Sequence, residues 1–591
     1  MKRGVALVVS LVGLAVIVSA AGLLVMFLLV GSGPSVPADA TLAFRPGGEL
    51  FEVPPADVLQ LVSASDARTV RGHIEALRRA KADPRVRTVL VAPRPFASPF
   101  WAKIQELRDA LIDFRGSGKS VIAFLESGGE REYYLASAAD RVYLLPTATL
   151  DLTGVATYEV FLRGTLDWIG TYPDLLHVGD YKTAVNTFTE RTFTPAHREM
   201  SVSLTADHYE ELVRAIAEAR TKPEAEVRAL IDRGPFLADE ALRHGLVDAL
   251  AYEDELDDID ESLRGSGARL VEADEYAAAG WDAVGLRRRA RIAVIHAVGT
   301  IASGRSGVDP VNGPVLGSDT IVEHIRQARA DASIRAFVLR IDSPGGSSTA
   351  SDVIWRELAI TKQDGQRRPL VVSMSDLAAS GGYYIATAGD VLVAQPGTLT
   401  GSIGIYTGKF VTGGSLEKAG ANVEATSQGR HAEMYSPDRR FTDEERARVE
   451  AGLQAFYDHF VEKVAEARQT TPEKIDQVAQ GRVWTGRQAR QNGLVDELGG
   501  LMTAVRIAKQ RAKIPLDEEV ELVIYPPRRS LYEMLSDQLA QPTRGQALTS
   551  AEAIVTLLGP RERRALGALL APSRLFRPGE LLAHMPYVFL R

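Results

Sequence analysis

Residues 383–404 read YYIATAGDVLVAQPGTLTGSIG, and residues 133–154 read YYLASAADRVYLLPTATLDLTG. The two stretches match at an offset of 250 positions (383 − 133 = 250). The matched residues are Tyr133-Tyr134 with Tyr383-Tyr384, Asp140 with Asp390, Pro146 with Pro396, and Gly154 with Gly404. Chance would hardly give all of these matches in order, so the chain contains an internal repeat.

The repeat extends in both directions once the offset changes to 248, which a two-residue insertion or deletion on each side explains. Upstream, Glu75, Arg78, Ala80, Ala82 and Asp83 meet Glu323, Arg326, Ala328, Ala330 and Asp331. Downstream, Gly245-Leu246-Val247-Asp248 recurs as Gly493-Leu494-Val495-Asp496. We therefore expect two homologous domains, at residues 40–255 and 291–510, joined by a linker at 256–290.

A C-terminal extension of unassigned role follows at residues 511–591. Its last part, from Ser550 onward, is apolar and studded with arginine. Two interpretations are open, an extra packing helix and a contact with a membrane surface.

Helical periods alternate with short apolar runs in each half of the chain. In the second half this pattern predicts strands at 292–298, 336–341, 370–374 and 391–394, and helices at 321–329 and 381–388. Such alternation is typical of βαβ units around a parallel sheet. The predicted fold class is α/β.

Composition excludes several classes of function. Lys and Arg total 68 against 76 for Asp and Glu, so the formal charge of -8 disfavours nucleic acid as a partner. The chain has no cysteine, which removes disulfides, thiolate catalysis and Cys-ligated zinc.

The N-terminus predicts a membrane anchor. No residue from Gly4 to Val30 is charged, and Lys2 and Arg3 precede the run. The run exceeds the roughly 20 residues that span a bilayer, and the basic pair favours a cytoplasmic N-terminus. We expect one transmembrane helix within residues 1–31, with the rest of the chain folded on the opposite side of the membrane from the N-terminus. A signal peptide cleaved near Ala38 or Ala40 and a buried core helix are the alternatives.

Two turns that follow predicted strands carry residues suited to acyl chemistry, because parallel sheets bind ligands at the carboxyl ends of their strands. One turn is Asp342-Ser343-Pro344-Gly345-Gly346, and the other leads to Ser380-Gly381-Gly382 at the start of a helix. Ser380 is suited to be a nucleophile, and amides of Gly345 or Gly346 with that of Gly381 are suited to bind an oxyanion. The alternative is an ordinary N-cap serine beside a glycine turn.

The repeat favours the catalytic interpretation. At the matching positions the first half has Glu130 in place of Ser380, and Ala97-Ser98 in place of Gly345-Gly346. Residues that serve only the fold would be expected in both copies. The asymmetry therefore points to a site that only the second half carries.

A serine nucleophile needs a base, and none of the ten histidines lies in these turns. A lysine can serve if burial lowers its pKa from near 10.4. The first half offers Lys182, in Gly179-Asp180-Tyr181-Lys182, whereas Ala432 stands at the matching position of the second half. We expect Lys182 to be the general base, with a surface charge as the alternative.

These motifs together resemble the long, two-half form of bacterial signal peptide peptidase, SppA or protease IV, over nearly the whole chain up to about residue 510. The motifs are the basic start with one anchor, the Tyr181-Lys182 pair, the Asp342–Gly346 turn, Ala379–Tyr384, and Leu399-Thr400-Gly401-Ser402-Ile403-Gly404. The resemblance implies a Ser380–Lys182 dyad built across the halves, with Ser402 orienting the lysine. It also implies a fold similar to crotonase and Clp protease in each half.

The same resemblance implies a homotetramer without cofactor or metal. It places the catalytic body on the periplasmic side of a bacterial inner membrane, among its lipids. The implied substrates are signal peptides left in the membrane after preprotein cleavage. Two rival hypotheses keep the duplicated fold, namely a crotonase-type acyl-CoA enzyme and a non-catalytic membrane scaffold.

Overall fold

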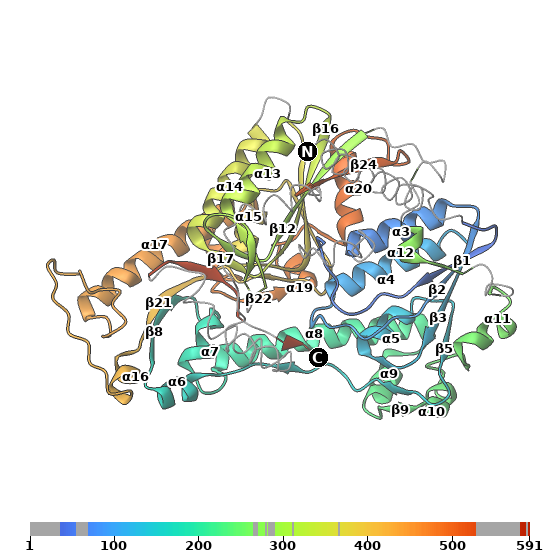
Figure 1. Cartoon of the computed structure of the whole chain (residues 1–591), viewed down its shortest axis with the longest axis horizontal. Helices are drawn as coiled ribbons and strands as arrows, with labels where there is room; N and C mark the ends of the chain where they lie inside the picture. Colours follow the sequence, from blue (N-terminus) through green and yellow to red (C-terminus); the bar gives the residue numbers. More distant parts are fainter. Residues whose placement is uncertain are drawn as a thin grey trace, which may run out of the picture.

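The computed structural model in Figure 1 describes residues 36–54, 69–263, 270–277, 290–309, 313–363, 367–527, 579–586 and 589–590, with Gly13 and Trp281. Strands and helices alternate along both halves of the chain. The α/β prediction is therefore confirmed.

The first half forms a parallel sheet of six strands. Their spatial order is β11 (Leu270–Glu272), β1 (Ala40–Phe44), β2 (Val86–Val91), β3 (Ser120–Leu125), β5 (Arg141–Leu144) and β10 (Ala249–Leu250). Every neighbouring pair is parallel. Strands β1, β2, β3 and β5 are mostly buried, as near-continuous apolar runs covered on both faces should be, whereas the edge strands β10 and β11 are partly exposed.

The second half repeats this order. Its strands are β24 (Val520–Tyr525), β12 (Ala290–Val298), β16 (Ile334–Ser343), β18 (Leu370–Ala379), β19 (Val391–Ala394) and β23 (Glu497–Leu498), all in parallel pairs. Two shorter strands, β20 (Leu399–Gly401) and β22 (Val483–Thr485), continue the sheet beside the end of β18. The internal repeat is thus also a repeat of strand order.

The outermost strands β11 and β24 lie beyond the domain boundaries expected at residues 255 and 510. β11 belongs to the expected linker and pairs with β1, and β24 belongs to the expected C-terminal extension and pairs with β12. These edge strands have only three and six residues, so their periodicity is too short to mark a domain from the sequence.

Helices cover both sheets. In the first half they include α3 (Val70–Ala82), α4 (Ala102–Arg115), α5 (Glu130–Ala136), α6 (Arg163–Ile169), α8 (Pro195–Arg220), α9 (Glu224–Ile231) and α10 (Ala238–Arg243). In the second half they include α13 (Ser318–Ala330), α14 (Ser348–Gln363), α15 (Gly381–Ala386), α16 (Gly413–Lys418), α17 (Asp443–Ala467), α19 (Gly486–Gln491) and α20 (Leu501–Arg511). The long helices α8 and α17 are preceded by Thr194 and Thr442, whose hydroxyls cap the first turn.

A third sheet combines segments from the whole chain. Its order is β14 (Gly307–Asp309), β15 (Gly313–Gly317), β13 (Thr300–Ala302), β17 (Gly345–Ser347), β25 (Leu582–His584), β21 (Ile405–Val411) and β8 (Tyr172–Val178). β8 comes from the first half and β25 from the C-terminal extension. Figure 1 shows β8 lying beside β21.

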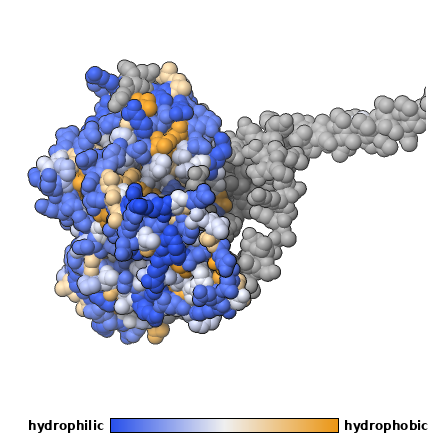
Figure 2. Space-filling model, turned by 90° about the vertical axis from the view of Figure 1, so that its left-hand side faces the viewer, coloured by the Kyte–Doolittle hydropathy of each residue, from blue (hydrophilic) through white to orange (hydrophobic). Residues whose placement is uncertain are grey.

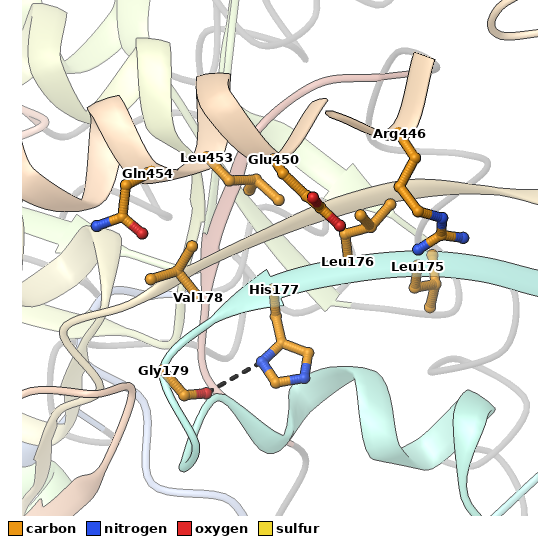
Figure 3. A pocket seen from close by; sticks show the side chains of 9 residues that line it. All are labelled: Leu175, Leu176, His177, Val178, Gly179, Arg446, Glu450, Leu453 and Gln454. Atoms are coloured by element: carbon orange, nitrogen blue, oxygen red, sulfur yellow. Dashed lines mark hydrogen bonds between the residues drawn. The ribbon is translucent and has the colours of Figure 1, made fainter. Parts of the chain in front are cut away.

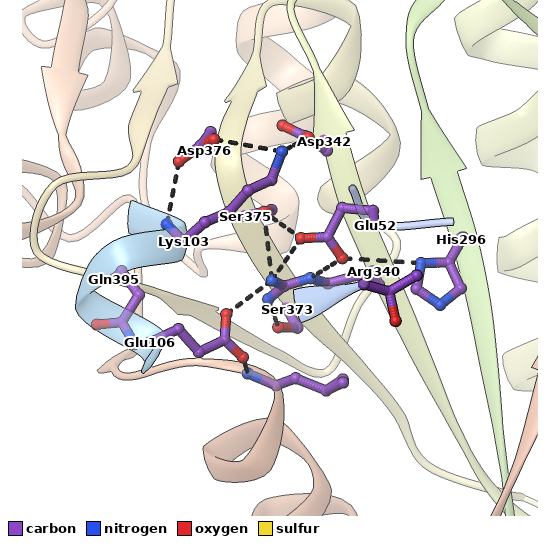
Figure 4. Close-up of polar contacts among 12 residues, drawn as sticks. Glu52, Lys103, Glu106, His296, Arg340, Asp342, Ser373, Ser375, Asp376 and Gln395 are labelled. Atoms are coloured by element: carbon purple, nitrogen blue, oxygen red, sulfur yellow. Dashed lines mark hydrogen bonds and ion pairs between the residues drawn. The ribbon is translucent and has the colours of Figure 1, made fainter. Parts of the chain in front are cut away.

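Charged groups buried between the two halves form a network between helix α4 and the second sheet (Figure 4). Arg340 of β16 is fully buried and binds Glu52 at 2.8 Å and Glu106 of α4 at 2.7 Å. Lys103 of α4 binds Asp342 at 2.7 Å and Asp376 at 3.3 Å. The network fixes α4 of the first half against β16 and β18 of the second.

No helix among the described residues is long and apolar enough to cross a membrane. The anchor expected within residues 1–31 lies outside the described residues, apart from Gly13. The face drawn in Figure 2 is mainly hydrophilic, with small and separate apolar areas.

We predict that Arg340→Met destabilises the protein by about 3–5 kcal/mol, because it leaves the buried carboxylates Glu52 and Glu106 without their cation. Urea unfolding of the full chain in detergent, followed by tryptophan fluorescence, measures the change. Arg335→Met is the matched control on the same strand, since Arg335 is exposed, and it should change stability by less than about 0.5 kcal/mol. Equal losses in the two variants would contradict this role of Arg340.

Candidate active site

Ser380 lies in a strained turn between β18 and α15. Its φ of 55° and ψ of -113° fall outside the regions that side chains favour, at a cost of about 1–3 kcal/mol. The Ser380 N–H donates to Gly401 O at 2.7 Å, which holds the turn in place. β18 runs directly to this serine, whereas the sequence predicted that the strand would end at Met374. The strand and the turn together fix the direction of the hydroxyl.

Strand β8 packs against the second half, and Lys182 lies in the loop that follows this strand. Seven residues of β8 pair with β21 in antiparallel register, from Tyr172 with Val411 to Val178 with Ile405. The loop that follows docks on the turn before β22, where the Tyr181 N–H donates to Gln480 O at 2.8 Å.

Glycines allow this close docking. A Cβ on Gly481 would lie 2.5 Å from Lys182 Cα, and one on Gly404 would lie 3.1 Å from Lys182 Cδ. Any larger residue at position 481 would displace the lysine backbone. The lysine therefore packs against bare backbone of the second half.

The structure brings Lys182, Ser380 and Ser402 together. Lys182 Nζ donates to Ser380 Oγ at 2.7 Å, to Ser402 Oγ at 3.0 Å and to Ser402 O at 3.1 Å. All three residues are 0% exposed. Burial lowers the pKa of Lys182 well below its usual 10.5. Among the described residues no carboxylate forms an ion pair with Lys182, so no opposite charge offsets the cost of burying an ammonium group.

The glycine turn lies against the serine turn. A Cβ on Gly345 would lie 2.6 Å from Gly381 N, so only glycine allows the two turns to approach. The Gly345 N–H donates to Ser343 Oγ at 3.2 Å and is therefore already occupied. Of the three amides expected to bind an oxyanion, that of Gly345 is thus taken up by Ser343, and Gly345 provides the close approach of the two turns.

Residues of the C-terminal extension reach this site, which the sequence did not predict. Strand β25 pairs with β17, with Gly345 opposite His584 and Gly346 opposite Ala583. His584 is 4% exposed, and burial together with the nearby Lys182 lowers its pKa to about 4. The available signal was the short apolar run after Gly579, which is too brief to identify a strand in a long extension.

A separate pocket of about 510 Å³ lies between β8 and α17 (Figure 3). It is lined by β8 residues, Gly179 and one face of α17, and the His177 ring bonds Gly179 O at 3.0 Å. None of the predicted site residues lines it. Among the described residues no cluster of His, Asp or Glu could hold a metal ion.

Comparison with known proteins identifies the family. Residues 113–264 and 362–515 match the model of peptidase family S49. Protease 4 of Salmonella typhi is 34% identical over 512 residues, which cover 84% of this chain and 81% of that protein. The chloroplastic serine protease SPPA of Arabidopsis thaliana is 33% identical over 465 residues, covering 78% and 68%.

A shorter relative, a putative signal peptide peptidase SppA of Enterococcus faecium, is 33% identical over 191 residues, which cover 32% of this chain and 55% of that protein. The longer matches extend over most of the chain, and the family model matches it twice. The chain therefore belongs to peptidase family S49, carries two copies of the family's domain, and is a serine protease similar to protease 4.

Proposed function

We propose that this protein is a membrane-anchored endopeptidase in which Ser380 is the nucleophile and Lys182 the general base. The observation that carries the proposal is the 2.7 Å contact between Lys182 Nζ and Ser380 Oγ in a buried site. A lysine without a carboxylate partner in such surroundings loses its proton easily, and a neutral amine can accept the serine proton.

In the proposed mechanism, Ser380 Oγ attacks the peptide carbonyl while Lys182 takes its proton. The N–H groups of Gly346 and Gly381 stabilise the oxyanion, an effect worth roughly 3–4 kcal/mol per donor. Lys182 then gives the proton to the leaving amine, and water activated by the same lysine releases the acyl group.

Ser402 is proposed to orient the lysine. Its hydroxyl and carbonyl oxygens both accept from Lys182 Nζ, and its own backbone is held at a φ of 49° by the bond from Ser402 N to Arg482 O. A long, flexible side chain held by two acceptors has one productive direction.

We further propose signal peptides in a bacterial inner membrane as substrates, with the catalytic body on the periplasmic side. The uncharged run Gly4–Val30 supports an anchor, and the similarity to a putative signal peptide peptidase of Enterococcus faecium supports the substrate class. A crotonase-like fold in each half and a homotetramer complete the proposal by family resemblance.

We predict that Ser380→Ala abolishes peptide hydrolysis, with kcat falling roughly a million-fold to background, because no other group can form the acyl intermediate. A fluorogenic peptide assay on the full chain in detergent measures the loss, and a fluorophosphonate probe should label wild type only. Ser117→Ala on the surface is the control and should behave as wild type. Retained turnover in Ser380→Ala would refute the assignment of the nucleophile.

The activity should also depend on pH in a defined direction. Since burial lowers the pKa of Lys182 and only the neutral amine is active, kcat/KM should rise through that lowered pKa and level off well before 10.5.

For stability, the unfolded chain binds one proton more than the folded chain between the lowered pKa and 10.5, so wild-type stability rises with pH in this window. Lys182→Met should therefore be inactive yet more stable than wild type near pH 7, with a smaller gain near pH 10. Urea unfolding at both pH values measures this, with exposed Lys474→Met as the control. A pH-independent loss of stability would contradict a neutral buried lysine.

Ser402→Ala should lower kcat about 10- to 100-fold and leave KM within twofold, because the lysine loses one of its acceptors while the substrate contacts remain. Steady-state kinetics separate the two constants. If kcat stays at the wild-type value, Ser402 does not orient the base.

A further inference from the structure

A β-bulge interrupts strand β18 just before Ser380. β16 and β18 pair in step up to Ile341 and Met374, and they pair again at Ser343 and Ala378. Between these two points β16 advances by two residues and β18 by four (343 − 341 = 2, 378 − 374 = 4), so the extra residues lie in β18. A bulge bends its strand and redirects the side chains that follow, and bulges are frequent beside active sites.

The bulge also changes the strand with which β18 pairs. Before it, Val371–Met374 pair with β19, and after it, Leu377–Ala379 pair with β20. Ser380 follows the last residue of β18, and Ser402 follows the last residue of β20. The shape of the bulge therefore sets the position of both serines relative to the rest of the sheet.

Two carboxylates bind backbone groups at the bulge. Asp342 lies on β16 opposite the extra residues, and its Oδ1 accepts the Leu377 N–H at 3.1 Å. Asp376 lies within the bulge, and its Oδ1 accepts the N–H of Lys103 in the first turn of α4 at 3.1 Å. The N-cap residue of α4, Trp101, makes no side-chain cap bond, so Asp376 supplies an acceptor to this helix end from the other half of the chain.

An ammonium group from the first half joins the two carboxylates (Figure 4). Lys103 Nζ lies 2.7 Å from Asp342 Oδ2 and 3.3 Å from Asp376 Oδ2. The side chains of the lysine and the two aspartates are 10%, 12% and 1% exposed, so solvent screens their charges only weakly. Without this cation, two like charges would repel each other across the bulge. The lysine thus holds the ends of β16 and β18 together.

The first copy of the domain lacks this arrangement. At the offsets of the repeat, Asp342 corresponds to Arg94 and Asp376 to Glu126 (342 − 248 = 94, 376 − 250 = 126), and both of these residues are exposed. The matching strands β2 and β3 pair without a shift of register. A feature that served only the fold would be expected in both copies. The bulge and its charges therefore belong to the copy that contains Ser380.

We propose that Lys103 is a positioning residue for the reaction. With Asp342 and Asp376 it holds the bulge in the shape that directs Ser380. The first half thus supplies both the proposed base, Lys182, and the cation that positions the nucleophile. The inference rests on the proposed function and adds a residue to it. A lysine that only stabilised the fold would change how many molecules are folded, whereas a positioning lysine changes how fast each folded molecule reacts.

The fluorophosphonate probe separates these two roles, because its end point counts competent sites and its rate constant reports the reactivity of Ser380. In the full chain in detergent, Lys103→Met should slow labelling of Ser380 about 10- to 100-fold, since a small displacement of a reacting atom has an effect of this size. The kcat per labelled site should fall by the same factor. KM should stay within twofold, because the lysine acts on the serine and not on the substrate.

Asp376→Asn keeps the size of the side chain, removes its charge and should slow labelling in the same way. Because both changes act through one bridge, the double variant Lys103→Met/Asp376→Asn should lose no more than the slower single variant. Arg78→Met is the matched control. Arg78 is another cation of the first half that pairs across the halves, with Glu519 at 2.9 Å, and its labelled sites should react at the wild-type rate.

Labelled sites of Lys103→Met that react as fast as those of wild type would overturn the inference and leave the proposed function intact. Losses that multiply in the double variant would also overturn it, because the two residues would then act separately. If Lys103→Met yields no folded protein, Asp376→Asn decides by the same rate constant and kcat. If wild type is neither labelled at Ser380 nor active on the fluorogenic peptide, the proposed function fails and the inference fails with it.

Discussion

The antiparallel pairing of β8 with β21 is the constraint on which the site depends. Lys182 and Ser380 are 198 positions apart, and they meet only because the first half contributes one strand to a sheet built from the second. Seven paired residues fix the register of that strand. A shift by one residue would turn the side chains of β8 to the opposite face and remove the lysine from the serine.

Burial then gives the contact its chemistry. A lysine in water would be charged and inert as a base, whereas Lys182 is enclosed by the bare backbone of Gly404 and Gly481 and has oxygen acceptors without negative charge. The same enclosure costs stability, as a functional site often does. The Arg340 network holds α4 against β16 and β18. These two strands lead to the glycine turn and to Ser380.

Much of this arrangement could be predicted from the sequence. The repeat, the parallel strands and the turn at Ser380 follow from local patterns, because apolar runs and glycines act on their immediate neighbours. The meeting of Lys182 with Ser380 was expected from asymmetry between the repeats and from family resemblance, but periodicity contains no information about distance. The Arg340 network was missed because a charged residue carries no sequence signal of its own burial. Strand β25 was missed because three residues carry almost no signal of secondary structure.

In the proposed mechanism, Lys182 loses its proton well below its ordinary pKa because it is buried beside Ser380. The most direct measurement is an NMR titration of the Lys182 side chain in protein with 13C-labelled lysine, assigned by the loss of its signal in Lys182→Met. The 13Cε shift should report an amine that loses its proton well below 10.5 and is therefore neutral over the pH range just under that value. A charged amine throughout this range, titrating at the ordinary value near 10.5, would contradict it.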